Sequence, residues 1–140
     1  MRKIFTILFC IMISSVSASY AALNGTYTVG GTTPDYATPV AAAAAVVSQG
    51  VSGPVVFNIR PGTYTGNMTM NNIAGTSAAN TVTFQAENGD STAVILTYPA
   101  GTTATDNWVF NIYGADWVTL RQLTIRRDGT GAYGTEIGRA

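Results

Sequence analysis

Two carboxylates, Asp90 and Asp116, have a spacing that could bring them together for chemistry. Each lies six residues after a phenylalanine, Phe84 or Phe110, in two similar five-residue blocks. If the blocks stack, both aspartates lie at the same turn of neighbouring coils, where a pair could separate its pKa values, hold Ca²⁺ or serve glycoside hydrolysis. Alternatively, each aspartate bonds the backbone of its own glycine-containing turn. Asp90 and Asp116 are therefore candidates for a metal site only, and no catalytic residue is assigned.

A second charged group consists of Arg126 and Arg127 beside Asp128. Arginine binds carboxylates in bidentate fashion, so this pair could grip an acidic sugar. The adjacent acid offsets part of the charge, which makes a solvated turn the simpler interpretation. Of the two tryptophans, Trp108 is predicted to be in the core, whereas the facing of Trp117 stays open.

The composition excludes several classes of function. The chain has no histidine and one cysteine, Cys10. This composition removes Ser-His-Asp and Cys-His nucleophiles and the typical zinc site. No glycine-rich phosphate loop opens a helix, so we expect no cofactor. Seven basic and seven acidic residues without a basic run make nucleic acid and anionic membranes poor partners.

Residues 1–21 have the three-part pattern of a secretory signal peptide. Arg2 and Lys3 precede an apolar run that ends at Ile13, and small residues follow up to Ala21. The run is shorter than the roughly 20 residues that span a membrane. We expect cleavage after Ala21, no membrane span in residues 22–140, and a secreted or cell-surface location; an uncleaved anchor is the alternative.

Three five-residue blocks recur along the rest of the chain. They are centred on Phe57, Phe84 and Phe110, which lie 27 and then 26 residues apart. A period of this length is typical of stacked coils. The two-residue period of strands places apolar side chains on one face of each block and one amide on the other. In a stack these amides, Asn58, Gln85 and Asn111, form a ladder of hydrogen bonds.

One helix is predicted from Thr38 to Val47, with Thr38 as its N-cap, Pro39 in the first turn and Gly50 after its end. It is apolar almost all round, so it must be covered. It could lie across the open end of a stack, or it could be an ordinary core helix of a mixed domain. Strands are predicted near 55–60, 68–70, 81–86, 93–97, 108–112, 117–120 and 123–126.

Three segments carry a family resemblance: residues 34–38 before the alanine-rich helix, residues 55–64, and residues 114–125. Their ordered set resembles the start of right-handed parallel β-helix proteins of the pectin-lyase-like superfamily. It is most similar to large secreted or surface proteins of Bacteroidetes-type bacteria, over about residues 24–130. The resemblance implies an N-terminal capping helix, many further coils, and catalytic groups on later coils. None of the family's active-site motifs matches a position in this chain.

The predicted fold class is all-β: a right-handed parallel β-helix of about three coils with an N-terminal capping α-helix, incomplete at the C-terminus. Residues 22–140 would form the cap and the first coils. The third coil is followed by no C-terminal cap, so we expect a fragment of a larger protein. A small β-sandwich with one helix is the alternative fold.

The leading functional hypothesis is a secreted or cell-surface module that is structural, adhesive or carbohydrate-contacting. Its partner would be a polysaccharide or a cell-surface glycan. The rival hypothesis is the N-terminal part of a polysaccharide lyase or glycoside hydrolase whose active site lies beyond residue 140.

Overall fold

The computed structural model describes residues 21–99, 107–129 and 137–139, so the predicted signal peptide lies outside the described residues except for Ala21. The described part contains ten strands and one helix. In chain order these are β1 (Leu23–Val29), α1 (Pro39–Gln49), β2 (Val51–Ile59), β3 (Gly62–Thr65), β4 (Met68–Met70), β5 (Val82–Ala86), β6 (Val94–Pro99), β7 (Phe110–Ile112), β8 (Val118–Arg121), β9 (Thr124–Asp128) and β10 (Ile137–Arg139).

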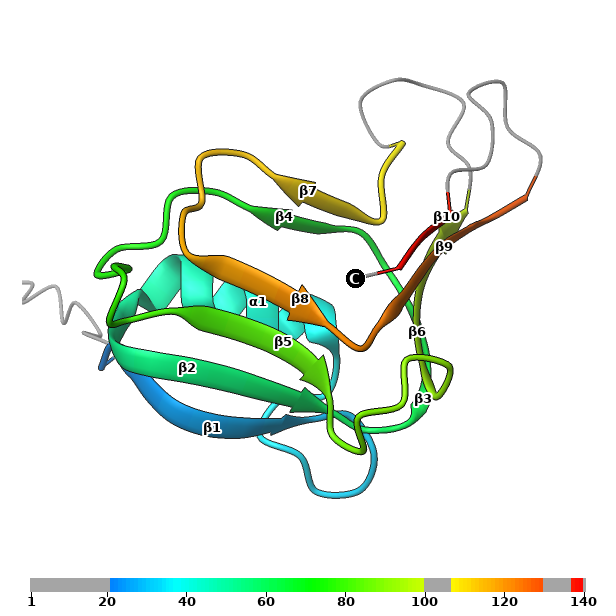
Figure 1. The fold of residues 1–140 in the computed structure, drawn as a ribbon, viewed down its shortest axis with the longest axis horizontal. Coiled ribbons are helices and arrows are strands. Elements are labelled where there is room, and N and C mark those ends of the chain that lie inside the picture. Colours follow the sequence, from blue (N-terminus) through cyan, green and yellow to red (C-terminus); the bar gives the residue numbers. More distant parts are fainter. Residues whose placement is uncertain (1–20, 100–106, 130–136, 140) are drawn as a thin grey trace, which may run out of the picture.

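The strands form three sheets (Figure 1). Sheet A has the order β1-β2-β5-β8, sheet B the order β10-β9-β6-β3, and sheet C consists of β4 and β7. Consecutive strands β2, β3 and β4 enter three different sheets, and so do β5, β6 and β7. Every pair is parallel except β10 with β9. The fold is therefore mostly β with parallel sheets, which agrees with the predicted all-β class.

Sheet A aligns the first two phenylalanine blocks. Phe57 is in register with Phe84, and their rings stack with centroids 4.6 Å apart. These blocks pair in parallel, whereas a hairpin of the alternative β-sandwich would pair its strands antiparallel. The prediction that the third block stacks beside the second is wrong. Phe110 pairs with Met68 in sheet C, and Leu120 lies beside Phe84 in sheet A.

Seven predicted strands correspond to β2 and to β4 through β9. The bounds of β4 are confirmed, and the other six differ by one to four residues at one or both ends. The pattern does not predict β1, β3 or β10. In β1 the alternation is weak because polar residues fill its centre around Gly25, and β3 is only four residues long. Short or irregular strands such as these carry little periodic signal.

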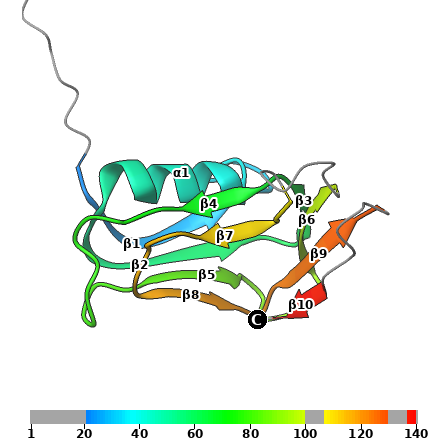
Figure 2. The ribbon, with the colours of Figure 1, turned by 90° about the horizontal axis from the view of Figure 1, so that it is seen from above.

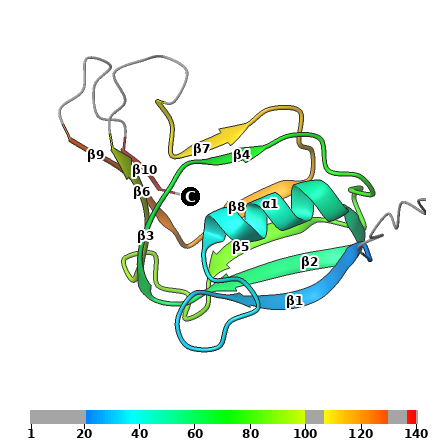
Figure 3. The same ribbon diagram turned by 180° about the vertical axis from the view of Figure 1, so that it is seen from behind.

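Helix α1 forms where the sequence predicts it. The side-chain oxygen of Thr38 accepts a hydrogen bond from the N–H of Ala41, Pro39 occupies the first turn, and Gly50 ends the helix with a φ of 69°. The helix packs on β4, β1 and β2. Figures 2 and 3 show α1 on one side of the assembled strands, with β8 on the far side of sheet A from β1. Among the described residues, no helix is long and apolar enough to cross a membrane.

The core lies between the sheets and α1. Alternate residues of β2 and β5 point into it, so Phe57 is fully buried and Phe84 is 1% exposed. The third block is less buried, since Ile112 is 49% exposed. Trp108, predicted to be in the core, is partly buried, whereas Trp117 is 53% exposed.

Candidate functional site

The two aspartates that the sequence singles out do not meet. In sheet A, Val82 at the start of β5 lies beside Val118 at the start of β8. Asp116 precedes β8, whereas Asp90 follows the other end of β5. The prediction that Asp90 and Asp116 share a turn is therefore wrong, because it rested on placing Phe110 in sheet A. The described residues contain no group of three or more His, Cys, Asp or Glu side chains that could hold a metal ion.

Asp90 instead bonds within its own turn, as the alternative interpretation predicts. Its carboxylate accepts hydrogen bonds from the backbone N–H of Thr92 at 2.8 Å and from the Thr92 hydroxyl at 2.7 Å. These bonds to Thr92 lower the pKa of the Asp90 carboxyl. Asp116 is an exposed residue at the corner before β8.

The two adjacent arginines point to opposite faces of β9. Arg126 is exposed and its Nε lies 2.9 Å from Asp128 Oδ1, whereas Arg127 is 7% exposed. The hydroxyl of Thr97 also donates to Asp128, and this bond, followed by the contact with Arg126, lowers the pKa of the Asp128 carboxyl. A joint grip of Arg126 and Arg127 on one sugar acid is therefore wrong, because successive strand residues face opposite ways.

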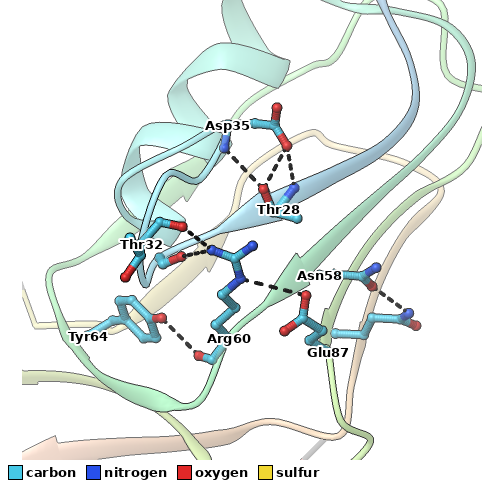
Figure 4. Close-up of polar contacts among 9 residues, drawn as sticks. Thr28, Thr32, Asp35, Asn58, Arg60, Tyr64 and Glu87 are labelled. Carbon is cyan, nitrogen blue, oxygen red and sulfur yellow. Dashed lines mark hydrogen bonds and ion pairs between the residues drawn. The ribbon is translucent and has the colours of Figure 1, made fainter.

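A polar cluster surrounds Arg60, which follows β2 (Figure 4). Its Nη1 donates to the carbonyl oxygens of Thr32 at 2.6 Å and Gly30 at 3.2 Å, and its Nε lies 3.7 Å from Glu87 Oε1. The hydroxyl of Tyr64 donates to the carbonyl oxygen of Arg60 at 2.8 Å. Arg60 therefore fixes the loop that follows β1 to the ends of β2 and β5.

That loop closes the outer edge of β1. The Asp35 carboxylate accepts from the backbone N–H and the hydroxyl of Thr28 at 2.7 and 2.8 Å, and these bonds lower the pKa of Asp35. The N–H of Tyr36 donates to the carbonyl oxygen of Thr28, and the carbonyl oxygen of Tyr36 accepts from the N–H of Gly30. We call these contacts, together with the hydrogen bonds of Arg60 to the same loop, the edge clamp. Its groups bond one another, so its role is structural.

The outer surface of sheet A carries the predicted amide ladder in part. Gln85 Nε2 donates to Asn58 Oδ1 at 2.9 Å, which confirms one rung. The second rung is wrong, since Asn111 pairs with Thr69 in sheet C. In sheet A, Thr28 of β1 lies beside Asn58 and Arg121 of β8 lies beside Gln85, so these two residues continue the row.

A second outward row lies beside this ladder, and an exposed aromatic residue precedes β8. Val56, Thr83 and Thr119 are in register across β2, β5 and β8. The N–H of Val82 donates to the carbonyl oxygen of Trp117, which places the backbone of Trp117 beside the start of β5. The backbone of Trp117 is left-handed, with a φ of 61°, a strained conformation for a bulky residue, and its side chain is 53% exposed.

We call this surface the outer face. Six of its members point outward from sheet A, and the seventh, Trp117, is the exposed residue directly before β8. The members are Val56, Asn58, Thr83, Gln85, Trp117, Thr119 and Arg121. Hydroxyl and amide groups of this kind both donate and accept hydrogen bonds, an exposed indole offers a flat apolar surface, and Arg121 adds a cation. Strand alternation over 118–121 could have indicated Thr119 and Arg121 from sequence, whereas no motif indicates the edge clamp.

No family model, curated protein or solved structure matches this chain.

Proposed function

We propose that this chain is an exported β-helix module of the pectin-lyase-like type, which contacts carbohydrate through the outer face and otherwise acts as a scaffold. Support for the β-helix comes from the winding of β2, β3, β4 and then β5, β6, β7 through the same three sheets. The matched register of Phe57 with Phe84, and of Asn58 with Gln85, agrees with stacked coils. Export rests on the signal-peptide pattern of residues 1–21.

The observation that carries the proposed ligand class is the composition of the outer face. A sugar ring has apolar C–H faces and a rim of hydroxyls, so it pairs with an exposed indole and with neutral groups that donate and accept. The Asn58–Gln85 bond leaves the Nδ2 of Asn58 and the Oε1 of Gln85 for other partners. Trp117, directly before β8, supplies the exposed ring.

The rival function is an enzyme of polysaccharide breakdown, with its active site beyond residue 140. Catalysis by the described residues would need two acids with separated pKa values near one bond of the substrate. Asp90 and Asp128 bond neighbouring threonines, and Asp35 belongs to the edge clamp. The bonds of all three lower the pKa, which opposes a general-acid role at neutral pH. These contacts oppose a glycoside-hydrolase site built on Asp35, Asp90 or Asp128.

Affinity electrophoresis in gels that contain polygalacturonate or xylan tests the proposal, with one acidic and one neutral polymer. We expect at least one polymer to retard the chain, and Trp117→Ala to remove most of the retardation. Tyr113→Ala is the matched control, because Tyr113 is a 76% exposed aromatic residue that ends sheet C rather than lying on sheet A. Gln85→Ala should weaken binding less than Trp117→Ala.

Two outcomes would contradict the proposal. One is normal mobility in both polymers together with a silent glycan array, and the other is equal retardation of Trp117→Ala and the unchanged chain. A reducing-end assay on the same polymers adds a third, since release of new ends would show hydrolysis or elimination by the chain itself and would contradict a non-enzymatic module.

A further inference from the structure

Two asparagines of the chain directly precede a glycine, and such pairs are open to a reaction with their own backbone. They are Asn24, before Gly25, and Asn88, before Gly89. The glycine nitrogen attacks Cγ of the asparagine side chain, forms a new N–Cγ bond, loses its proton and expels the side-chain nitrogen as ammonia. Water then opens the resulting succinimide at either carbonyl and leaves an aspartate or an isoaspartate. A glycine favours the attack because it has no Cβ to hinder its nitrogen.

The structure fixes Asn24 through both its side chain and its backbone. A Cβ added at Gly53 of β2 would meet Oδ1, Cγ and Nδ2 of Asn24, so the whole amide group lies against Gly53. The N–H of Asn24 donates to the Tyr27 hydroxyl at 3.3 Å, and its carbonyl oxygen accepts from that hydroxyl at 3.2 Å. Gly25 is itself paired with Val55. Attack by the Gly25 nitrogen therefore requires movement of a strand segment that is paired with β2, which costs free energy.

Asn88 lies instead in the exposed turn between β5 and β6. Its Oδ1 accepts a hydrogen bond from the backbone N–H of Asp90 at 3.1 Å, so its side chain is folded toward the residues that follow it. This donor polarises the side-chain carbonyl and would stabilise the negative charge that develops on its oxygen during attack. The N–H of Gly89 bonds the carbonyl oxygen of Ala86 at 3.2 Å, a long bond in an exposed turn that opens at little cost.

We propose that Asn88 is a site of spontaneous deamidation in the folded protein and that the fold protects Asn24 from the same reaction. The reaction needs water as its only co-reactant. It places a carboxylate beside Glu87, the ion-pair partner of Arg60. An aspartate product can still accept the bond from the N–H of Asp90, whereas an isoaspartate product lengthens the backbone of the turn by a methylene group. This inference goes beyond the carbohydrate proposal and does not depend on it.

Incubation of the full chain in mildly alkaline buffer, with and without urea, tests the inference on the unchanged protein. Proteolysis and electron-transfer tandem mass spectrometry then locate each converted asparagine and distinguish aspartate from isoaspartate. In native buffer, Asn88 should convert at least about tenfold faster than Asn24, a ratio that needs a barrier difference of only about 1.4 kcal/mol. In urea the strand and the turn are both lost, so the two rates should agree within about twofold.

Two variants supply the second arm. In Gly89→Ala the added Cβ hinders the attacking nitrogen, and it would lie 3.5 Å from Nε2 of Gln122, an ordinary contact for which the turn has room. Conversion at Asn88 should fall at least about tenfold, and the acidic band that it produces in isoelectric focusing should fall with it. Gly25→Ala is the matched control and should leave the rate at Asn88 within about twofold, because Gly25 lies in β1 and not in the turn. Circular dichroism identifies a variant that fails to fold, and the urea comparison needs no substitution.

Four results would overturn the inference. In native buffer, these are conversion of Asn24 as fast as that of Asn88, or an unchanged Asn88 over a period in which the urea-unfolded chain converts. A preference for Asn88 that persists undiminished in urea would assign it to local sequence and not to the fold. An acidic band that grows equally in folded Gly89→Ala and in the unchanged chain would show that its source lies elsewhere.

Discussion

The stacked rings of Phe57 and Phe84 allow the register of sheet A to be measured in solution. Their centroids are 4.6 Å apart, the rings are tilted by 26°, and both side chains are at most 1% exposed. Phe→Leu keeps most of the apolar volume, so we expect each single change to cost about 1–2 kcal/mol. The ring–ring interaction contributes about 0.5–1.5 kcal/mol beyond burial. Either single change removes it, so the double variant should cost less than the sum by about that amount.

Urea unfolding of the four proteins, followed by far-UV circular dichroism, gives the free energy of unfolding of each. With a slope of about 2 kcal/mol per molar, the middle of the usual range for small proteins, each single change should lower the midpoint by roughly 0.5–1 M. Phe84→Leu combined with Tyr113→Leu is the control pair, because Tyr113 is 76% exposed, and its two effects should add within about 0.5 kcal/mol. A Phe57–Phe84 coupling below about 0.3 kcal/mol would refute the stacked register, and so would a larger coupling in the control pair.

Three further predictions concern hydrogen bonds and backbone conformation. The pKa of Asp35 is lowered in the folded chain, so its contribution to stability is present above the ordinary carboxylate pKa of about 3.9 and is lost as pH falls through the folded value. Asp35→Asn should therefore destabilise the protein at pH 7, and melts across pH 7 to 2.5 should show the gap from the unchanged chain closing toward low pH. Asn58→Ala and Gln85→Ala should each cost about 1 kcal/mol in urea unfolding, and the double variant should cost less than their sum, because one bond joins them. Gly75 has a φ of +86°, and a Cβ at this position would lie 2.0 Å from a carbonyl oxygen of β2. Gly75→Ala should therefore cost more than the roughly 1–2 kcal/mol of a left-handed conformation. Gly25→Ala is the control: Gly25 has a φ of +100° and no atom within 4 Å of the added Cβ, so thermal melts should show only the conformational cost.

The sequence predicts most accurately those parts of the fold in which spacing and pattern repeat together. Phe57 and Phe84 lie in similar blocks 27 residues apart, and the structure pairs them. Phe110 lies at nearly the same spacing, yet its block belongs to sheet C. The true neighbour of Phe84 is Leu120, in a short strand with the same alternation. Spacing alone cannot distinguish the two, because the corners between strands differ in length from one coil to the next.

Among the candidate sites, too, only contacts that depend on a repeated pattern are predictable. The Asn58–Gln85 bond is predictable because it depends only on register and strand alternation. The edge clamp is not predictable, because Arg60 reaches carbonyl oxygens about 30 residues earlier in the chain, and backbone acceptors leave no trace in residue types. Asp90 and Asp116 have the residue type of a metal site, but their meeting depended on the register that failed.

The two edges of sheet A differ in what a new strand would have to displace. At β1, a strand would have to break the bonds of Thr28 to Asp35 and Tyr36, and the carboxylate of Asp35 would lose its donors. Hydrogen bonds to an ionised carboxylate are stronger than those between neutral groups, so their loss opposes addition of a strand. At β8, the backbone groups of Val118 and Leu120 would exchange water for a strand, and the adjacent apolar side chains would become covered. Addition of a strand therefore breaks existing hydrogen bonds at β1 but none between described strands at β8, so β8 is the edge at which a further coil would continue sheet A.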